Sequence, residues 1–264
     1  MNYFIYIAFI SHFFVYSQNN DSIPLFEYEV NYSLGKALVK KGYVFELDGN
    51  IYYNTSKTEF LENMERLTFS EQTGVPNINI ISAGNGIENS VSLLKENIHI
   101  DTYSVGNEVI RTDEVLQKLQ WVSTGEKRVV NGRDCVKMMS KFRGRVYLAY
   151  VDLTVPVNFG PWKFNNFPGL PVLIYDIENK LKWTLTGINK ESRSDFFDFI
   201  QKQKFYLNSL RKVTLREYVK IYDETDNGRS TIVSKLPRDY KQVPGQKKKK
   251  RGGLELIFEW ETED

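Results

Sequence analysis

Few residues in this chain are suited to nucleophilic or metal chemistry. It contains two histidines, His12 and His99, and a single cysteine, Cys135. Metal centres rich in histidine and cysteine need several such ligands, so these counts exclude them. A nucleophilic pair of Cys135 and His99 is formally possible, but neither residue lies in a recognisable catalytic turn. We therefore predict that Cys135 is buried and structural, and that His99 occupies a solvent-facing position in a strand over residues 98–101.

The charged residues Arg143, Arg145 and Asp176 offer a second kind of chemistry. The arginines flank Gly144, so on a strand they would share one face. They could hold a carboxylate or a phosphate, and two solvated turn cations are the simpler interpretation. Asp176 follows an apolar run over residues 172–175, and we expect it to accept hydrogen bonds from nearby turn amides. The sequence shows no EF-hand spacing, Walker A pattern or Gly-x-Ser-x-Gly elbow, while a calcium site made of carboxylates stays open.

Residues 160–176 form a segment dense in proline, glycine and aromatic residues. The prolines fix φ, and the glycines permit backbone conformations closed to other residues. The aromatic side chains can fold back over apolar surface. We predict a rigid corner set by Gly160, Pro161, Pro168, Gly169, Leu170 and Asp176. A ligand-binding rim is the first alternative, formed by Trp162, Phe164, Phe167, Arg143 and Arg145, and a catalytic loop is the second.

Alternation of apolar and polar residues dominates the elements that must position these side chains. Residues 26–33 alternate strictly, and Asp48-Gly49-Asn50 and Asn131-Gly132 are typical of hairpin turns. Further strands are predicted at 78–82, 97–105, 109–110, 146–151, 172–177, 181–185 and, as a closing strand, 254–260. Helices are predicted at 192–205, with Phe196, Phe197, Phe199 and Ile200 on one face, and at 214–223. These elements predict a mainly β protein with a large, strongly curved antiparallel sheet or incomplete barrel, covered by one or two helices. A β sandwich is the alternative.

The first residues are typical of an export signal. Residues 3–16 are almost wholly apolar or aromatic, which matches a signal-peptide core and is short for a membrane span. Small or modest side chains at Val15 and Ser17 suggest cleavage before Gln18. We therefore predict a signal peptide at 1–17 and a single β-rich domain at 18–264, located in the periplasm or the envelope, or outside the cell. A basic run, 247–251, lies in a loop at 244–253 that we expect to be mobile.

Composition limits the classes of partner and cofactor that the sequence supports. The formal net charge is +2, which argues against a general nucleic-acid binder. No stretch after the signal is apolar enough to suggest a membrane-spanning helix, and one cysteine allows no disulfide within the chain. No motif points to a cofactor. The partner is unknown, and an envelope protein or a lipid is the expected kind.

The middle of the chain resembles the GLPGLI family, exported proteins of Bacteroidota that largely lack an assigned function. The resemblance covers residues 130–183 and rests on the order of its parts. These are Asn131-Gly132-Arg133-Asp134-Cys135, an aromatic-rich strand at 142–150, Val155-Pro156, Gly160-Pro161 and Asn166-Phe167-Pro168-Gly169-Leu170-Pro171. The name motif departs at Asn166, Phe167 and Pro171, and Asn166 could still hold a left-handed conformation. The resemblance identifies a divergent member and implies an exported protein without a known activity.

The sequence is compatible with three candidate functions. The first is a non-enzymatic envelope protein that binds a lipid, a peptide or an envelope partner, supported by the export signal and the aromatic-rich strands. The second is a carboxylate-dependent hydrolase, which would need two acids converging in a cleft. The third is a structural interaction module that uses the basic run at 247–251 as its contact. The lack of a catalytic signature favours a protein that is not an enzyme.

Overall fold

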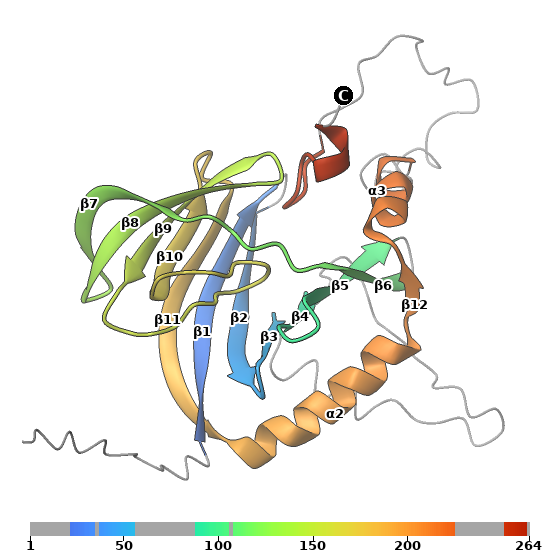
Figure 1. Cartoon of the computed structure of the whole chain (residues 1–264), viewed down its shortest axis with the longest axis horizontal. Helices are drawn as coiled ribbons and strands as arrows, with labels where there is room; N and C mark the ends of the chain where they lie inside the picture. The colour runs from blue at the N-terminus through green and yellow to red at the C-terminus, as the bar shows by residue number, and fades with distance from the viewer. Residues whose placement is uncertain (1–21, 35–36, 56–87, 106–107, 225–250, 263–264) are drawn as a thin grey trace, which may run out of the picture.

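The computed structural model describes residues 22–34, 37–55, 88–105, 108–224 and 251–262. The described strands form one open sheet of twelve strands, in the order β12-β6-β5-β4-β3-β2-β1-β11-β10-β9-β8-β7 (Figure 1). Its strands are β1 (Ser22–Ser33), β2 (Ala37–Leu47), β3 (Asn50–Asn54), β4 (Asn89–Leu93), β5 (Ile98–Val105), β6 (Glu108–Val115), β7 (Val122–Val130), β8 (Arg133–Phe142), β9 (Arg145–Asp152), β10 (Leu170–Asp176), β11 (Leu181–Ser192) and β12 (Arg211–Val213). Neighbours are antiparallel, except that β12 runs parallel to β6. The predicted mainly β, incompletely closed sheet is confirmed, and the described strands form no sandwich.

Sequence alternation and turn chemistry explain these strands. In β1, Phe26, Tyr28 and Val30 are buried while Glu27 and Glu29 are not, as a half-buried strand requires. The hairpin turns then depend on residues that accept positive φ. Asp48 and Gly49 have φ of 55° and 76°, and Asn131 and Gly132 have φ of 49° and 75°. Both pairs suit the hairpin turns predicted from the sequence, since type I′ turns need positive φ at both central residues.

Helix α2 (Arg193–Ser209) covers one face of the β2–β5 part of the sheet (Figure 1). Phe196 and Ile200 pack there against Phe45 and other apolar residues of the sheet. Ser192 caps the helix by accepting a hydrogen bond from the Ser194 amide. The prediction that Phe197 shares the packed face is wrong, because consecutive helical residues point about 100° apart and this ring is 60% exposed.

The larger core lies on the β1, β9, β10 and β11 part of the sheet. Residues 153–169 connect β9 to β10 and carry Phe159, Trp162, Phe164 and Phe167 into this core. Trp183 of β11 is fully buried at its centre, with the Phe164 and Trp162 rings 4.9 and 6.2 Å away between centroids. The connection therefore contributes side chains to the hydrophobic core.

The segment 160–171 has the geometry of a tight corner. The Gly160 amide donates to the Phe164 carbonyl, and Asn166 adopts the left-handed φ of 60° anticipated from its type. A Cβ on Gly169 would lie 2.4 Å from the Asp152 carbonyl oxygen, so the backbones pack too closely for any side chain. Pro171 sits one residue inside β10, where the pairing with β9 shifts register and needs no donor from it.

The C-terminal segment, residues 251–262, differs from the prediction. Its alternating pattern predicted a closing strand, but it forms an irregular stretch followed by a 3-10 turn, η1 (Glu259–Glu261). Its amides at Leu256 and Ile257 donate to the Arg143 carbonyl at the β8–β9 turn, and Phe258 packs on α3 (Leu215–Glu224). Thr214 and Glu217 form a capping box at the start of α3.

Several predictions fall outside the described residues. These are the signal peptide at 1–17, the strand at 78–82 and residues 244–250 of the basic loop. Within the described part of the chain, no helix has the length and apolar character needed to cross a membrane.

Candidate functional site

The turn between β8 and β9 places Arg143 and Arg145 in the interior. Arg143 and Gly144 have φ of 42° and 79°, and the side chains of Arg143 and Arg145 are 3% and 4% exposed. Solvated turn cations are therefore the wrong interpretation. Both arginines instead bind carboxylates that belong to the chain itself.

Arg145 joins three separate parts of the chain. Its Nη1 donates to Asp176 Oδ2 at 2.7 Å, and its other nitrogens donate to the carbonyls of Gly253 and Leu254. Asp176 Oδ1 accepts from the amides of Lys180 and Leu181, which confirms the predicted turn contacts. Arg145 and Asp176 thus fix the β10–β11 turn and the C-terminal segment to β9.

Arg143 belongs to a buried ion cluster, which we define as Asp101, Glu114, Arg143, Lys163 and Glu255. Arg143 donates to Glu114 and Glu255. Lys163 Nζ lies 2.6 Å from Glu114 Oε1, 2.9 Å from Glu255 Oε1 and 3.4 Å from Asp101 Oδ2. All five side chains are less than a tenth exposed. The cluster therefore joins β5, β6, the β8–β9 turn, the corner and the C-terminal segment.

Strand register explains why the acids of β5 and β6 meet. Glu114 lies directly opposite His99, so these two side chains share a face of the sheet, and Asp101 follows two residues along the same face. That face is covered by the corner, which delivers Lys163 from between Trp162 and Phe164. Trp162 has a φ of 56°, and this left-handed residue redirects the chain directly before Lys163.

The ion cluster holds Glu114, Lys163 and Arg143 in their charged forms. Burial raises the pKa of Glu114, but Lys163 and Arg143 outweigh it and lower that pKa to about 2. Burial lowers the pKa of Lys163 and of Arg143, and the carboxylates of Glu114 and Glu255 reverse this and raise both. At neutral pH Glu114 is thus an ionised carboxylate, which cannot donate a proton.

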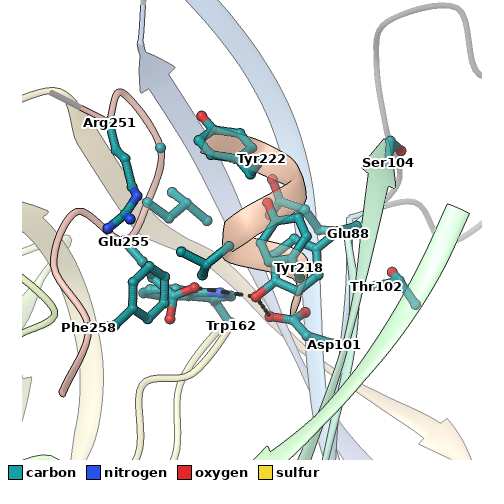
Figure 2. A pocket seen from close by; sticks show the side chains of 14 residues that line it. Glu88, Asp101, Thr102, Ser104, Trp162, Tyr218, Tyr222, Arg251, Glu255 and Phe258 are labelled. Atoms are coloured by element: carbon teal, nitrogen blue, oxygen red, sulfur yellow. Dashed lines mark hydrogen bonds between the residues drawn. The ribbon is translucent and has the colours of Figure 1, made fainter. Parts of the chain in front are cut away.

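An open pocket of about 240 Å³ borders the ion cluster, and Asp101 and Glu255 belong to both (Figure 2). Five rings line it, from β5, the corner, α3 and the C-terminal segment: Tyr103, Trp162, Tyr218, Tyr222 and Phe258. Tyr103 and Tyr218 stack with centroids 3.9 Å apart. We call this site the aromatic pocket. The pocket is also lined by the charged residues Glu88, Asp101, Arg251 and Glu255. Figure 2 shows the carboxylates of Asp101 and Glu255 beside the Trp162 and Tyr218 rings.

The residues predicted to form a ligand rim do not lie together in the structure. Trp162 lines the aromatic pocket. Phe164 and Phe167 are buried in the larger core, where Phe167 stacks on Trp121 at 4.3 Å. Arg145 is occupied by Asp176. Arg143 borders a second hollow of about 470 Å³ between residues 117–122, residues 139–143 and Glu259.

Sequence reasoning missed the other residues of the pocket and of the ion cluster. Glu114 and Glu255 gave no signal, because a charged residue in a polar-looking position is normally solvated. Arg251 was expected in a mobile loop, yet its guanidinium contacts Glu261 and Asp223 and is 13% exposed. One signal was available for Lys163, since a lysine flanked by two aromatic residues inside a packed corner has little access to solvent.

His99 is buried, and its predicted solvent-facing position is wrong. The residue is 2% exposed, and Nδ1 lies 2.8 Å from Ser92 Oγ on the neighbouring strand. Its Nε2 points toward Asp101 Oδ2 at 3.9 Å. The reason is that the face of β5 that would have met solvent in a simple hairpin is covered by the corner. Cys135 is buried as predicted, and burial raises the pKa of its thiol.

The pocket brings acids together without the arrangement of a metal centre. Asp101 and Glu255 both accept from the Tyr103 hydroxyl, at 3.1 and 3.3 Å, and both contact Lys163. Among the described residues no group of three or more histidine, cysteine, aspartate or glutamate side chains could hold a metal ion. The arrangement can accept hydrogen bonds from a donor and hold a positive charge against aromatic faces.

No protein-family model and no curated protein matches the sequence. The matching solved structures include two of PNGF-II, in space groups C2 and P21. Both are 13% identical to this chain, with TM-scores of 0.49 and 0.48, and the match covers 76% of this chain. It covers 32% and 33% of the PNGF-II chains, so this chain spans about a third of their length.

Proposed function

We propose that this protein is an exported, non-enzymatic binding protein of the cell envelope, and that the aromatic pocket is its ligand site. The apolar segment at 3–16 and the GLPGLI resemblance support export. The pocket itself supports binding, because five aromatic side chains from four separate elements converge on one open cavity. The polar groups beneath it are few, buried and fixed by ion pairs, as expected where a site orients a ligand.

The state of the acids argues against catalysis. A hydrolase of the carboxylate type needs one protonated acid and one free carboxylate. Glu114 has a lowered pKa, and Glu255 is in direct contact with both Arg143 and Lys163. A carboxylate-dependent hydrolase is the second candidate function. It is supported by one observation, which is that Asp101 and Glu255 both line the pocket.

The structural interaction module loses part of its support. It relied on the basic run at 247–251, and Arg251 at the end of that run is bound to Asp223 and Glu261 within the chain.

Filling the pocket tests the proposed function. In Val219→Trp, a large ring would occupy the space between α3 and the C-terminal segment. Val129→Trp, on the edge strand β7, is the control because its side chain is exposed far along the sheet order from the pocket. We expect crosslinking in cells, followed by mass spectrometry, to capture a lipid, peptide or protein with the wild type and the control but not with Val219→Trp. Equal capture by all three proteins would reject the pocket as the site.

Export has its own measurement. Mass spectrometry of the protein from an envelope fraction should show an N-terminus at Gln18. A chain that retains residues 1–17 in the cytoplasm would reject the export part of the proposal.

A further inference from the structure

We propose that the aromatic pocket binds an organic cation, an ammonium or guanidinium group with a small apolar body. This inference rests on the proposed function, since it names the chemical class of the ligand for that same site. It is carried by three features of the pocket: its charge balance, its ring walls and its size.

The charge balance beneath the pocket is negative. Arg143 and Lys163 provide two positive charges. Their carboxylate partners are four: Asp101, Glu114, Glu255 and Glu259. The Arg251 guanidinium, which also lines the pocket, is itself matched by two carboxylates, Asp223 and Glu261. Among the described residues, three buried carboxylates, Asp101, Glu114 and Glu255, thus face two buried cations, and this excess of negative charge favours a cationic ligand and disfavours an anionic one.

The chain already places one ammonium group against this surface. Lys163 Nζ lies 5.6 Å from the centroid of the Trp162 ring and 5.9 Å from that of Tyr103, while contacting Asp101, Glu114 and Glu255. The same carboxylates and ring faces that bind the Lys163 ammonium inside the protein can also bind a cation that enters from the pocket.

Within the described part of the chain, Asp101 retains an oxygen for such a ligand. The contacts of its carboxylate with Tyr103, Lys163 and His99 all involve Oδ2. The residue is 5% exposed and lines the pocket, so Oδ1 is an acceptor in a site of low solvent access. Tyr103, whose hydroxyl donates to Asp101 Oδ2, stacks on Tyr218, and Figure 2 shows the Tyr218 ring beside Asp101.

The volume restricts the body of the ligand. A cavity of about 240 Å³ is below the roughly 300–1,000 Å³ of sites that enclose drug-sized ligands. It can take a single head group or side chain, whereas the acyl chains of a lipid do not fit. The same chemistry is supplied by a free small amine or by the lysine or arginine side chain of a peptide.

Isothermal titration calorimetry with matched probes tests the ligand class. The mature chain is titrated with phenethylammonium, with the neutral 2-phenylethanol and with the anionic 3-phenylpropionate. We expect the cation to bind about tenfold or more tightly than the alcohol, the anion not to bind, and the cation's affinity to fall as salt rises. Asp101→Asn should weaken binding of the cation and leave the alcohol unchanged. Glu178→Gln, an exposed acid in the β10–β11 turn, is the control and should change neither.

A second pair of probes separates the two sources. A capped Gly-Lys-Gly peptide is compared with the same peptide acetylated on the lysine side chain. Tighter binding of the peptide than of phenethylammonium, lost on acetylation, identifies a basic side chain as the ligand. Weaker binding of the peptide identifies a free amine.

The outcomes separate this inference from the proposed function. Equal binding of cation and alcohol, or tighter binding of the anion, overturns the cation class and leaves the pocket as a binding site. If no probe binds but Val219→Trp still loses the partner captured by the wild type, the organic cation is rejected as the ligand and the pocket remains the binding site. The pocket fails as the ligand site of the proposed function if Val219→Trp keeps its partner. The wild-type comparison of probes decides the class even if Asp101→Asn does not fold.

Discussion

At the scale of single residues, Gly169 is the position where the corner tolerates no side chain. The absent Cβ is what lets residues 168–170 lie against the backbone of Asp152 and Leu153. Backbone atoms cannot rotate away as a flexible side chain would, so any Cβ here must separate two chain segments. The corner then cannot keep Trp162 and Phe164 in the core.

Gly169→Val should therefore impair folding. We expect a loss of about 3 kcal/mol or more in the free energy of unfolding, because overpacking against fixed atoms is costly. Urea denaturation followed by circular dichroism measures it. Gly252→Val is the matched control, since a Cβ there meets nothing within 4 Å and we expect almost no change. A Gly169→Val protein of normal stability would contradict the close packing described for the corner.

Residue types predicted local conformation well and long-range contacts poorly. Asn131, Asp48 and Asn166 adopt positive φ as their types suggested, and Asp176 accepts the expected turn amides. These outcomes depend on neighbours in sequence. Lys163 and His99 depend on which segment covers a sheet face, and no local pattern contains that information.

At the scale of elements, the C-terminal segment shows how a strand pattern can mislead. Its apolar residues alternate, but no strand edge of the described sheet is available beside it, and it packs by side chains instead. Phe258 is buried between the Arg143 and Arg251 guanidinium groups, at 5.1 and 5.3 Å from its ring centroid, and stacks on Trp260. Glu255, on the predicted outer face, is buried in the ion cluster.

Phe258→Ala should release this segment from the sheet. We expect a loss of about 3 kcal/mol, the lower end for a buried phenylalanine, and faster amide hydrogen exchange in residues 251–262. Hydrogen-exchange mass spectrometry reads the local effect directly. Ile257→Ala removes a neighbouring side chain that is 46% exposed and should cost less than about 1 kcal/mol. If both variants exchange at the wild-type rate, Phe258 does not anchor the segment.

At the scale of the whole molecule, the buried ion cluster connects parts of the sheet that are distant in the strand order. Asp101 and Glu114 come from β5 and β6, whereas Arg143 comes from the β8–β9 turn. Removing one partner of such a cluster leaves an uncompensated buried charge, which costs several kcal/mol. The cluster should therefore make global stability depend on pH.

The sign of that dependence follows from Glu114. Its folded pKa of about 2 lies below the ordinary 4.5, so its contribution is complete above pH 5 and is lost as pH falls toward 2. The difference corresponds to roughly 3 kcal/mol. We expect the free energy of unfolding to fall over this range, and Glu114→Gln to be less stable at pH 7 and to show a shallower fall. Urea titrations at a series of pH values measure both.

A control on the same strand isolates the effect of burial. Glu108→Gln removes an acid that is half exposed and paired with Arg211 at the surface, which lowers its pKa only under strong solvent screening, and we expect the slope to change far less than in Glu114→Gln. An identical pH profile for Glu114→Gln and the wild type would show that the cluster does not govern acid stability.

The class of fold was predictable because alternation and turn signals recur along the chain. The number of strands, their order and the parallel pairing of β12 were not, because they depend on how distant segments meet. The candidate site was least predictable, since its residues come from β5, the corner, α3 and residues 251–262. Only Trp162 among the predicted rim residues lines the aromatic pocket.

The position of β1 in the sheet has a consequence for the order of folding. β1 lies between β2 and β11, and the Tyr28 hydroxyl donates to the Pro171 carbonyl across 143 residues of sequence. A chain delivered from its N-terminus presents β1 long before β11 exists to pair with it. Contacts of this sequence separation close slowly. Until then one edge of β1 and its apolar side chains are exposed to other chains, so synthesis or transport of this protein should depend on a chaperone that holds it unfolded.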